Sequence, residues 1–225
     1  MSQKTLIDIV ITSDCERKEH KQLTDNCIAS LVASQPYEDA FNIIVVEGYS
    51  KFMDNQHTHD HCMLALPREP FHYNRYLIAG SKCGNAEWVA LCNNDLLFDK
   101  GWFTALNAAF NAHNGAFKSF GTWCPLTHPQ TMQGSNSYYI GYRIAHELTG
   151  WCIIVRRELW ERMDINQKPE FWYCDNAYAD ELRRLGEPNM LIRSCIVTHL
   201  GSQTIKDLPK AELSRLTYNQ KKNYK

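Results

Sequence analysis

Polar side chains of chemically useful types stand at the ends of separate apolar runs in this chain. Asp95 comes just after a run that ends at Cys92, and Glu47 and His199 close two further runs. Because ligands of open α/β sheets collect at the carboxyl ends of strands, we expect these side chains to share one cleft. Asp95 has the oxygen donors that a hard divalent cation prefers, and a nitrogen from His199 would favour Mn²⁺ slightly over Mg²⁺.

A second carboxylate has the features of a general base. Asp175 opens a predicted helix directly after the aromatic run of residues 171–173, so the helix dipole favours its ionised, proton-accepting form. The aromatic neighbours are suited to excluding water. A cation beside a departing diphosphate and a base beside a hydroxyl are what sugar transfer from a nucleoside diphosphate requires.

The elements that must position these residues alternate through the first half of the chain. Apolar runs predict strands, and apolar residues at helical spacing, such as Cys27 and Leu31, predict helices. The predicted strands cover residues 6–12, 42–47, 62–66 and 87–92, and the predicted helices cover residues 19–34 and 71–82, with another after residue 99. This alternation predicts an α/β fold with a mostly parallel central sheet flanked by helices.

The second half is less regular. We predict strands at residues 120–124, 152–155 and 192–199, helices at residues 157–163 and 175–185, and a long Gly-, Ser- and Tyr-rich loop at residues 125–143. Long loops in compact domains are usually functional or disordered.

Composition sets the remaining bounds. The chain has 225 residues and a formal charge of -1, which fits one soluble domain and gives no global attraction to nucleic acid or membranes. Its 9 cysteines lie mainly in apolar runs without CxxC spacing, so they read as reduced core thiols. The first residues lack a secretory apolar segment and no run is long enough for a membrane helix, so we expect a cytoplasmic protein.

The ordered motifs resemble family 2 glycosyltransferases of the GT-A fold over roughly residues 5–202. IDIVITSD is similar to the opening strand and loop of that family, CIASL to its first helix, and VVEGYS to its second strand and acidic end. FHYNRYLIAG precedes NND, which stands where the family has its D-x-D metal motif, and LLFDKGW follows. LTGWCIIVRRELWE, FWYCDNAYADELRRLG and CIVTHLGSQT match later family segments.

The resemblance implies a Rossmann-like single domain that inverts the anomeric centre of a nucleotide sugar, most simply a UDP-sugar. Residues 1–115 would form the half that binds the nucleotide sugar, residues 116–202 the acceptor half, and residues 203–225 a C-terminal helix and basic tail. Asp175 would be the catalytic base, and the metal would be Mn²⁺ or Mg²⁺. The donor and metal residues would be Thr12, Glu47, Asn74, Asn93, Asn94, Asp95 and His199.

Two departures from the family pattern leave alternatives open. Asn93 replaces the first acid of the metal motif, and Cys174 replaces the first acid of the acidic pair. A binding module without turnover, for nucleotide sugars or nucleic acid, is therefore the rival function. The acceptor is expected to be soluble: a glycan, a protein, or a hydroxymethylated pyrimidine base in bacteriophage DNA, for which the lysines of the tail are suited to phosphate contacts.

Structural roles compete with the functional ones. Asn94 and Asp95 suit a turn between strands, Asp175 a helix cap, and His199 a hydrogen bond at a strand end. The stretch from His57 to Cys62 is rich in zinc-ligand types, but its alternating spacing sends neighbours to opposite sides of an extended chain. We interpret it as a polar loop near the donor cleft, with a structural zinc site as the alternative.

Overall fold

The computed structural model describes residues 7–15, 17–34, 41–48, 59–113, 115–128, 132, 136–165 and 174–201. The predictions for the aromatic run at 171–173 and for the tail at 203–225 lie outside these ranges. Within them the strands are β1 (Ile7–Ser13), β2 (Phe41–Glu47), β3 (Met63–Ala65), β4 (Trp88–Cys92), β5 (Leu96–Phe98), β6 (Ser119–Trp123), β7 (Tyr138–Gly141), β8 (Cys152–Arg156) and β9 (Asn189–His199). The helices are α1 (Lys18–Ala33), α2 (Tyr73–Ser81), α3 (Trp102–Ala112), α4 (Arg157–Trp160) and α5 (Cys174–Leu185).

The first half of the chain forms the parallel part of the sheet. β1 pairs in parallel with β2 on one side and with β4 on the other, and β3 extends this parallel part beyond β2. The register sets Ser13 opposite Glu47, and Ile11 opposite Cys92. The residues that follow these strands therefore emerge at one edge of the sheet, as the strand-end pattern predicted.

The second half adds antiparallel contacts to the sheet. β8 lies antiparallel between β4 and β6, while β9 pairs in parallel with β6 and antiparallel with β5. The predicted loop at 125–143 was wrong in part, because β7 lies within it and pairs antiparallel with β9. The tyrosines of β7 form a strand because they pair with β9, and this pairing depends on the tertiary structure.

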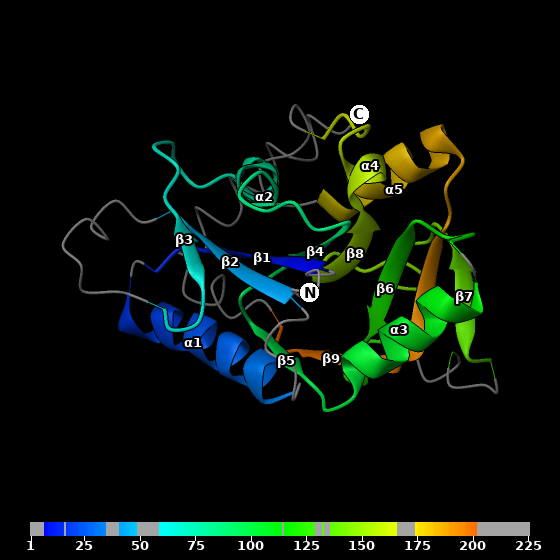
Figure 1. Cartoon of the computed structure of the whole chain (residues 1–225), viewed down its shortest axis with the longest axis horizontal. Coiled ribbons are helices and arrows are strands. Elements are labelled where there is room, and N and C mark those ends of the chain that lie inside the picture. The colour runs from blue at the N-terminus through cyan, green and yellow to red at the C-terminus, as the bar shows by residue number, and fades with distance from the viewer. Residues whose placement is uncertain are drawn as a thin grey trace, which may run out of the picture.

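Helices cover both faces of this sheet (Figure 1), and the α/β prediction is confirmed. On one face, α1 and α3 pack on the sheet around a core that includes Leu31, Trp102 and Leu106. On the other face, α2, α4 and α5 enclose a second core that includes Leu77 and Leu182. All residues of β1 are buried, because neighbouring side chains of the strand point alternately into the two cores.

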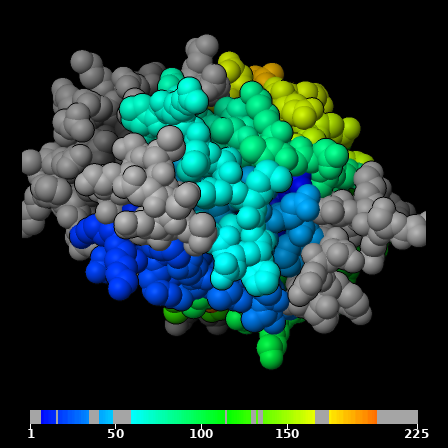
Figure 2. Space-filling model, turned by 60° about the vertical axis from the view of Figure 1, so that its left-hand side comes forward, coloured from blue at the N-terminus to red at the C-terminus, as the bar shows by residue number. Residues whose placement is uncertain are grey.

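The edge of the sheet at β3 lies on the molecular surface. Figure 2 shows the cyan atoms of β3 and its neighbours beside the blue surface of α1. Met63 and Leu66 are 51% and 45% exposed there, and the strand itself is short, as protected sheet edges commonly are. Among the helices that the structure describes, none combines the length and apolar character needed to cross a membrane.

Candidate active site

The centre of the site is a carboxylate and an imidazole that the sheet brings together. Asp95 follows β4, His199 ends β9, and β5 pairs with β9 so that Leu96 lies opposite His199. The Asp95 Oδ1 and His199 Nε2 atoms are 3.2 Å apart, with side chains 5% and 12% exposed. Sequence analysis placed these residues in one cleft, and the structure brings them into contact.

Asn93 and Tyr73 extend this centre toward α2. The Asn93 amide nitrogen lies 3.4 Å from His199 Nε2, and its Oδ1 accepts a 2.9 Å hydrogen bond from the Tyr73 hydroxyl. The Gly150 carbonyl is a second acceptor, 3.0 Å from the same hydroxyl oxygen, so the single hydroxyl proton is available to either group. Burial raises the pKa of Tyr73 well above its usual value, so this phenol stays a hydrogen-bond donor. Tyr73 thus holds Asn93 and the segment at Gly150 in one arrangement.

Trp151 forms one wall of the centre. Its ring stacks on the His199 imidazole with a centroid separation of 5.1 Å and an angle of 15° between planes. The Asn93 backbone N–H donates to the Trp151 carbonyl at 2.9 Å, which ties this wall to the segment that carries Asp95. The Trp151 ring also contacts the His128 ring in an edge-to-face arrangement. An aromatic face beside a polar centre is suited to stacking on a sugar or a base.

Asp175 packs against Gly150, the residue directly before Trp151. A Cβ added at Gly150 would be 2.9 Å from the Asp175 Cβ, so only glycine lets α5 approach this closely. Asp175 stands in the first turn of α5, and its Oδ1 accepts the Asn176 N–H at 2.9 Å. Burial raises the pKa of Asp175 above its ordinary value, and the backbone hydrogen bonds oppose that rise. Its carboxylate is therefore more basic than an exposed one.

The predicted donor residues split into two groups. Asn93 lies in the centre, whereas Asn74 lies on α2, 2% exposed, lining the same small cavity as Cys174 and Asp175. A hydrogen bond from Asn74 reaches the Cys174 thiol. Asn74 therefore meets the start of α5.

The other predicted donor residues lie near the ends of β1, β2 and β4. Thr12 is 4% exposed and its hydroxyl donates to the Cys92 carbonyl at 3.5 Å. Asn94 donates to the Thr24 hydroxyl of α1 at 3.0 Å. Glu47 is 1% exposed and accepts the Cys15 N–H at 2.8 Å. These side chains hold the backbone beneath the sheet edge. Their contacts with a nucleotide sugar stay predictions.

Sequence reasoning missed Tyr73 and the part played by Gly150. Tyr73 precedes Asn74 in the motif that was singled out, and Gly150 precedes Trp151, so both stood next to recognised positions. Neither residue type by itself indicates this function, because the contacts to Asn93 and Asp175 arise across distant parts of the chain.

The donor set of the centre fits a divalent metal ion. Bonds of about 2.1 Å to one octahedral ion place neighbouring ligands roughly 3 Å apart. The 3.2 Å between Asp95 Oδ1 and His199 Nε2 matches that spacing. Carboxylate with imidazole is a pair that Mn²⁺ accepts.

Comparisons with known proteins agree on the fold. Neither a protein-family model nor a curated protein sequence matches the chain. Among solved structures, the mannosyltransferase PcManGT from Pyrobaculum calidifontis, in complex with GDP-Man and Mn²⁺, superposes with a TM-score of 0.62 at 13% identity. The alignment covers 90% of this chain and 59% of that one. S. aureus TarS 1-349 superposes with a TM-score of 0.63 at 11% identity, covering 94% and 69% respectively.

Two consequences follow from these comparisons. The chain has the fold of this mannosyltransferase, which confirms the fold that the motif order predicted. It spans less than two thirds of the length of that mannosyltransferase, 59%. Identities this low establish shared architecture and leave the reaction to be argued from the site.

Proposed function

We propose that the chain is an inverting glycosyltransferase that moves a sugar from a nucleoside diphosphate, such as a UDP-sugar, to a hydroxyl group. A neighbour with the same fold binds GDP-Man and Mn²⁺, which supports a nucleotide-sugar donor with a divalent metal. The base of the nucleotide remains open, and UDP is the first donor to test because the sequence resemblance favours it.

One observation carries the proposal. His199, half of the metal pair, stacks on Trp151, and Asp175, the proton acceptor, packs on the adjacent Gly150. A cation site and a basic carboxylate therefore flank the same short segment. Transfer of a sugar from a diphosphate needs these two functions close together.

The roles of the residues follow from the chemistry of the step. Asp95 and His199 would hold the metal, and a bound divalent cation supplies charge neutralisation for the departing diphosphate. Asp175 accepts the proton of the acceptor hydroxyl. The hydroxyl oxygen then forms a bond to the anomeric carbon on the face opposite the diphosphate, whose C–O bond breaks, so the configuration inverts. Trp151 provides an apolar face for the sugar or acceptor.

The remaining predicted residues act as positioning residues in this proposal. Asn74 supports the start of α5 through Cys174, and Asn94 ties the metal motif to α1 through Thr24. Thr12 and Glu47 fix the ends of β1 and β2 at the nucleoside side of the cleft. Residues 1–115 then supply the donor half and residues 116–202 the acceptor half.

The test is Asp175→Asn, with Asp180→Asn as the matched control on the exposed side of the same helix. Loss of a general base typically lowers the rate about 10²–10⁴-fold. We expect UDP release in the presence of acceptor and Mn²⁺ to fall by that factor in the first variant, with the donor dissociation constant by calorimetry nearly unchanged. Asp180→Asn should behave as the wild type. Normal transfer by Asp175→Asn would overturn the base assignment.

The same assay separates the rival function and identifies the acceptor. A panel of UDP- and GDP-sugars is offered with glycans, a protein mixture, and DNA that contains hydroxymethylated pyrimidines. A binding module would bind donor and release no nucleotide with any acceptor. The DNA arm adds a further requirement, because phosphate contacts make binding weaken steeply with salt. Absence of DNA binding at low ionic strength would exclude that acceptor.

A further inference from the structure

A second cluster of metal-ligand side chains lies apart from the Asp95–His199 pair. Cys15 follows β1, Glu47 ends β2, and His59 precedes β3. They are 0%, 1% and 7% exposed. The parallel pairing of β1 with β2 and of β2 with β3 brings these elements side by side. One ligand atom from each residue lies within 4.8 Å of the others.

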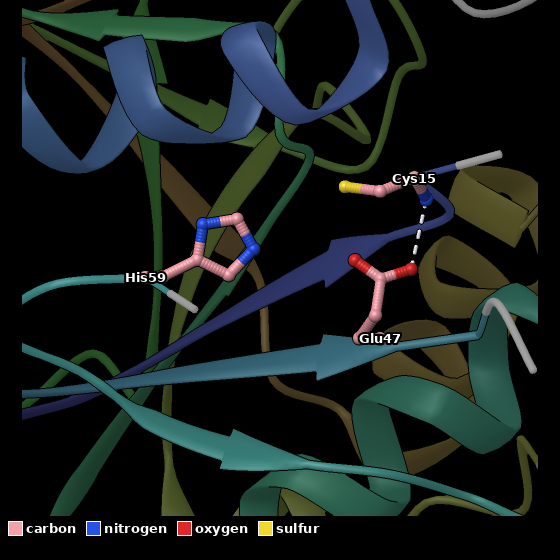
Figure 3. A group of neighbouring side chains, drawn as sticks. All are labelled: Cys15, Glu47 and His59. Atoms are coloured by element: carbon pink, nitrogen blue, oxygen red, sulfur yellow. Dashed lines mark hydrogen bonds between the residues drawn. The ribbon is translucent and has the colours of Figure 1, made fainter. Parts of the chain in front are cut away.

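The three side chains converge on one point. Figure 3 shows the Cys15 thiol, the Glu47 carboxylate and the His59 ring directed toward a common space between them. Glu47 is held in this direction because its Oε1 accepts the Cys15 N–H at 2.8 Å. That bond leaves the second carboxylate oxygen on the side of the thiol and the imidazole.

A carboxylate behind His59 fixes its ring. His59 Nδ1 lies 2.6 Å from Asp25 Oδ1 on α1. A ring that donates its Nδ1–H to a carboxylate presents Nε2 as a basic donor, and metal-binding histidines in proteins almost always have such a partner. The arrangement of Asp25, His59 and the common space is therefore that of a carboxylate–histidine–metal array.

We propose that Cys15 Sγ, Glu47 Oε2 and His59 Nε2 bind a Zn²⁺ ion at this end of the sheet. Thiolate, imidazole and carboxylate are the zinc ligands of proteins, whereas Mn²⁺ and Mg²⁺ disfavour thiolate. One thiolate and one carboxylate neutralise the two charges of the ion, which suits a buried position. Water fills the fourth tetrahedral position.

The spacing of the ligands is compatible with this ion. Zinc bonds of about 2.0–2.3 Å in a tetrahedron separate the ligand atoms by roughly 3.3–3.8 Å. The atoms of the cluster lie within 4.8 Å of one another, so movements of about 1 Å by the side chains close the site.

The zinc site goes beyond the proposed transferase function and has a structural role. It would join the ends of β1 and β2 to the segment before β3. The metal motif of the active site touches the same region, because Asn94 donates to Thr24, whose hydroxyl lies 2.9 Å from the Ser13 hydroxyl. Glu47 would then influence the donor through the backbone that it holds.

The first experiment measures zinc directly on the full chain, purified without chelators. We expect elemental mass spectrometry to find one equivalent of tightly bound Zn²⁺ per chain. After removal and replacement by Co²⁺, we expect the intense near-ultraviolet absorption of a cobalt–thiolate bond. Absence of zinc, together with failure of the metal-free chain to bind added Zn²⁺ at micromolar concentration, would overturn the proposal.

Variants assign the ligands. Cys15→Ser should weaken Zn²⁺ binding at least 100-fold and abolish the cobalt–thiolate band. Asp25→Asn removes the carboxylate behind His59, together with its ion pair to Lys21 on the surface of α1, and should weaken zinc binding about 10–100-fold. Cys83→Ser is the matched control at an exposed cysteine, and its zinc content should equal that of the wild type. If Cys15→Ser fails to fold, His59→Gln gives the same test.

A final variant separates the zinc site from the active site. Asp95→Asn should retain the full equivalent of Zn²⁺ while its transfer activity requires a higher Mn²⁺ concentration than that of the wild type. Zinc that disappears in Asp95→Asn and persists in Cys15→Ser would overturn the proposal, because the ion would then belong to the Asp95–His199 pair. An inactive protein with one Zn²⁺ bound through Cys15 would support the zinc site and contradict the transferase.

Discussion

Gly150→Ala tests the geometry on which the proposed base depends. The new methyl carbon would lie 2.9 Å from the Asp175 Cβ, whereas carbon atoms in ordinary contact are about 3.5–4.0 Å apart. Asp175 or the Gly150 segment must therefore move by roughly 0.6–1.1 Å. The backbone at Gly150 does not have the positive φ that would strain alanine, so the contact itself is the perturbation.

The expected effect is large on the rate and moderate on stability. A displacement of about 1 Å at a reacting group can cost roughly 100-fold in rate, which corresponds to about 2.7 kcal/mol of transition-state stabilisation. Overpacking of this kind costs about 1–3 kcal/mol of folding free energy. We expect kcat to fall by up to about 100-fold with the donor KM nearly unchanged, because the proposed function assigns donor binding to the metal pair and not to Asp175.

The control is Gly101→Ala, which carries a similar stability cost without a contact. Gly101 has φ of 86° and nothing within 4 Å of an added Cβ. Its strain of about 1–2 kcal/mol should lower Tm by a few degrees, comparable to Gly150→Ala, and leave kcat unchanged. Thermal unfolding and nucleotide release are measured for both. If Gly150→Ala keeps a normal kcat at the same loss of Tm, the placement of Asp175 is unimportant and the reasoning fails.

Further predictions concern pH, metal and the core. Because burial raises the pKa of Asp175, the acid limb of the pH–rate profile should lie above that of an ordinary aspartate, and Asp175→Asn should remove it. The raised pKa also means that the folded state binds this proton more tightly than the unfolded state, so the resulting stabilisation is complete at low pH and is lost as pH rises through the folded pKa. Asp175→Asn should therefore raise Tm near neutral pH. An unchanged or lower Tm would argue against the pKa shift. Asp95→Asn should raise the Mn²⁺ concentration for half-maximal activity by at least about 10–100-fold, and a titration unchanged from the wild type would exclude Asp95 as a ligand. Asp8 is fully buried against Arg157, so Asp8→Ala should lower the free energy of unfolding in urea by about 3–5 kcal/mol. Asp180→Ala, at an exposed ion pair, should lower it by under about 1 kcal/mol, and equal losses would contradict the difference in burial.

Local pattern determined much of the fold and the chemical types of the site. Apolar runs and helical spacing predicted β1, β2, β4 and the flanking helices, because parallel strands covered on both faces are continuously apolar. The pattern also predicted that Asp95 and His199 stand at strand ends, since each polar residue comes where an apolar run stops. The motif order predicted the fold that the solved structures share.

Only the tertiary structure decided which of these side chains meet. The sequence gives no sign that β7 pairs with β9, or that Tyr73 bridges Asn93 and Gly150, because these contacts join residues far apart in the chain. The histidine-rich stretch read alone is a polar loop, yet folding buries His59 beside Cys15, which follows β1, and Glu47, which ends β2. Residue types fix what chemistry is available, and the free energy of packing the whole chain fixes which groups are close enough to perform it.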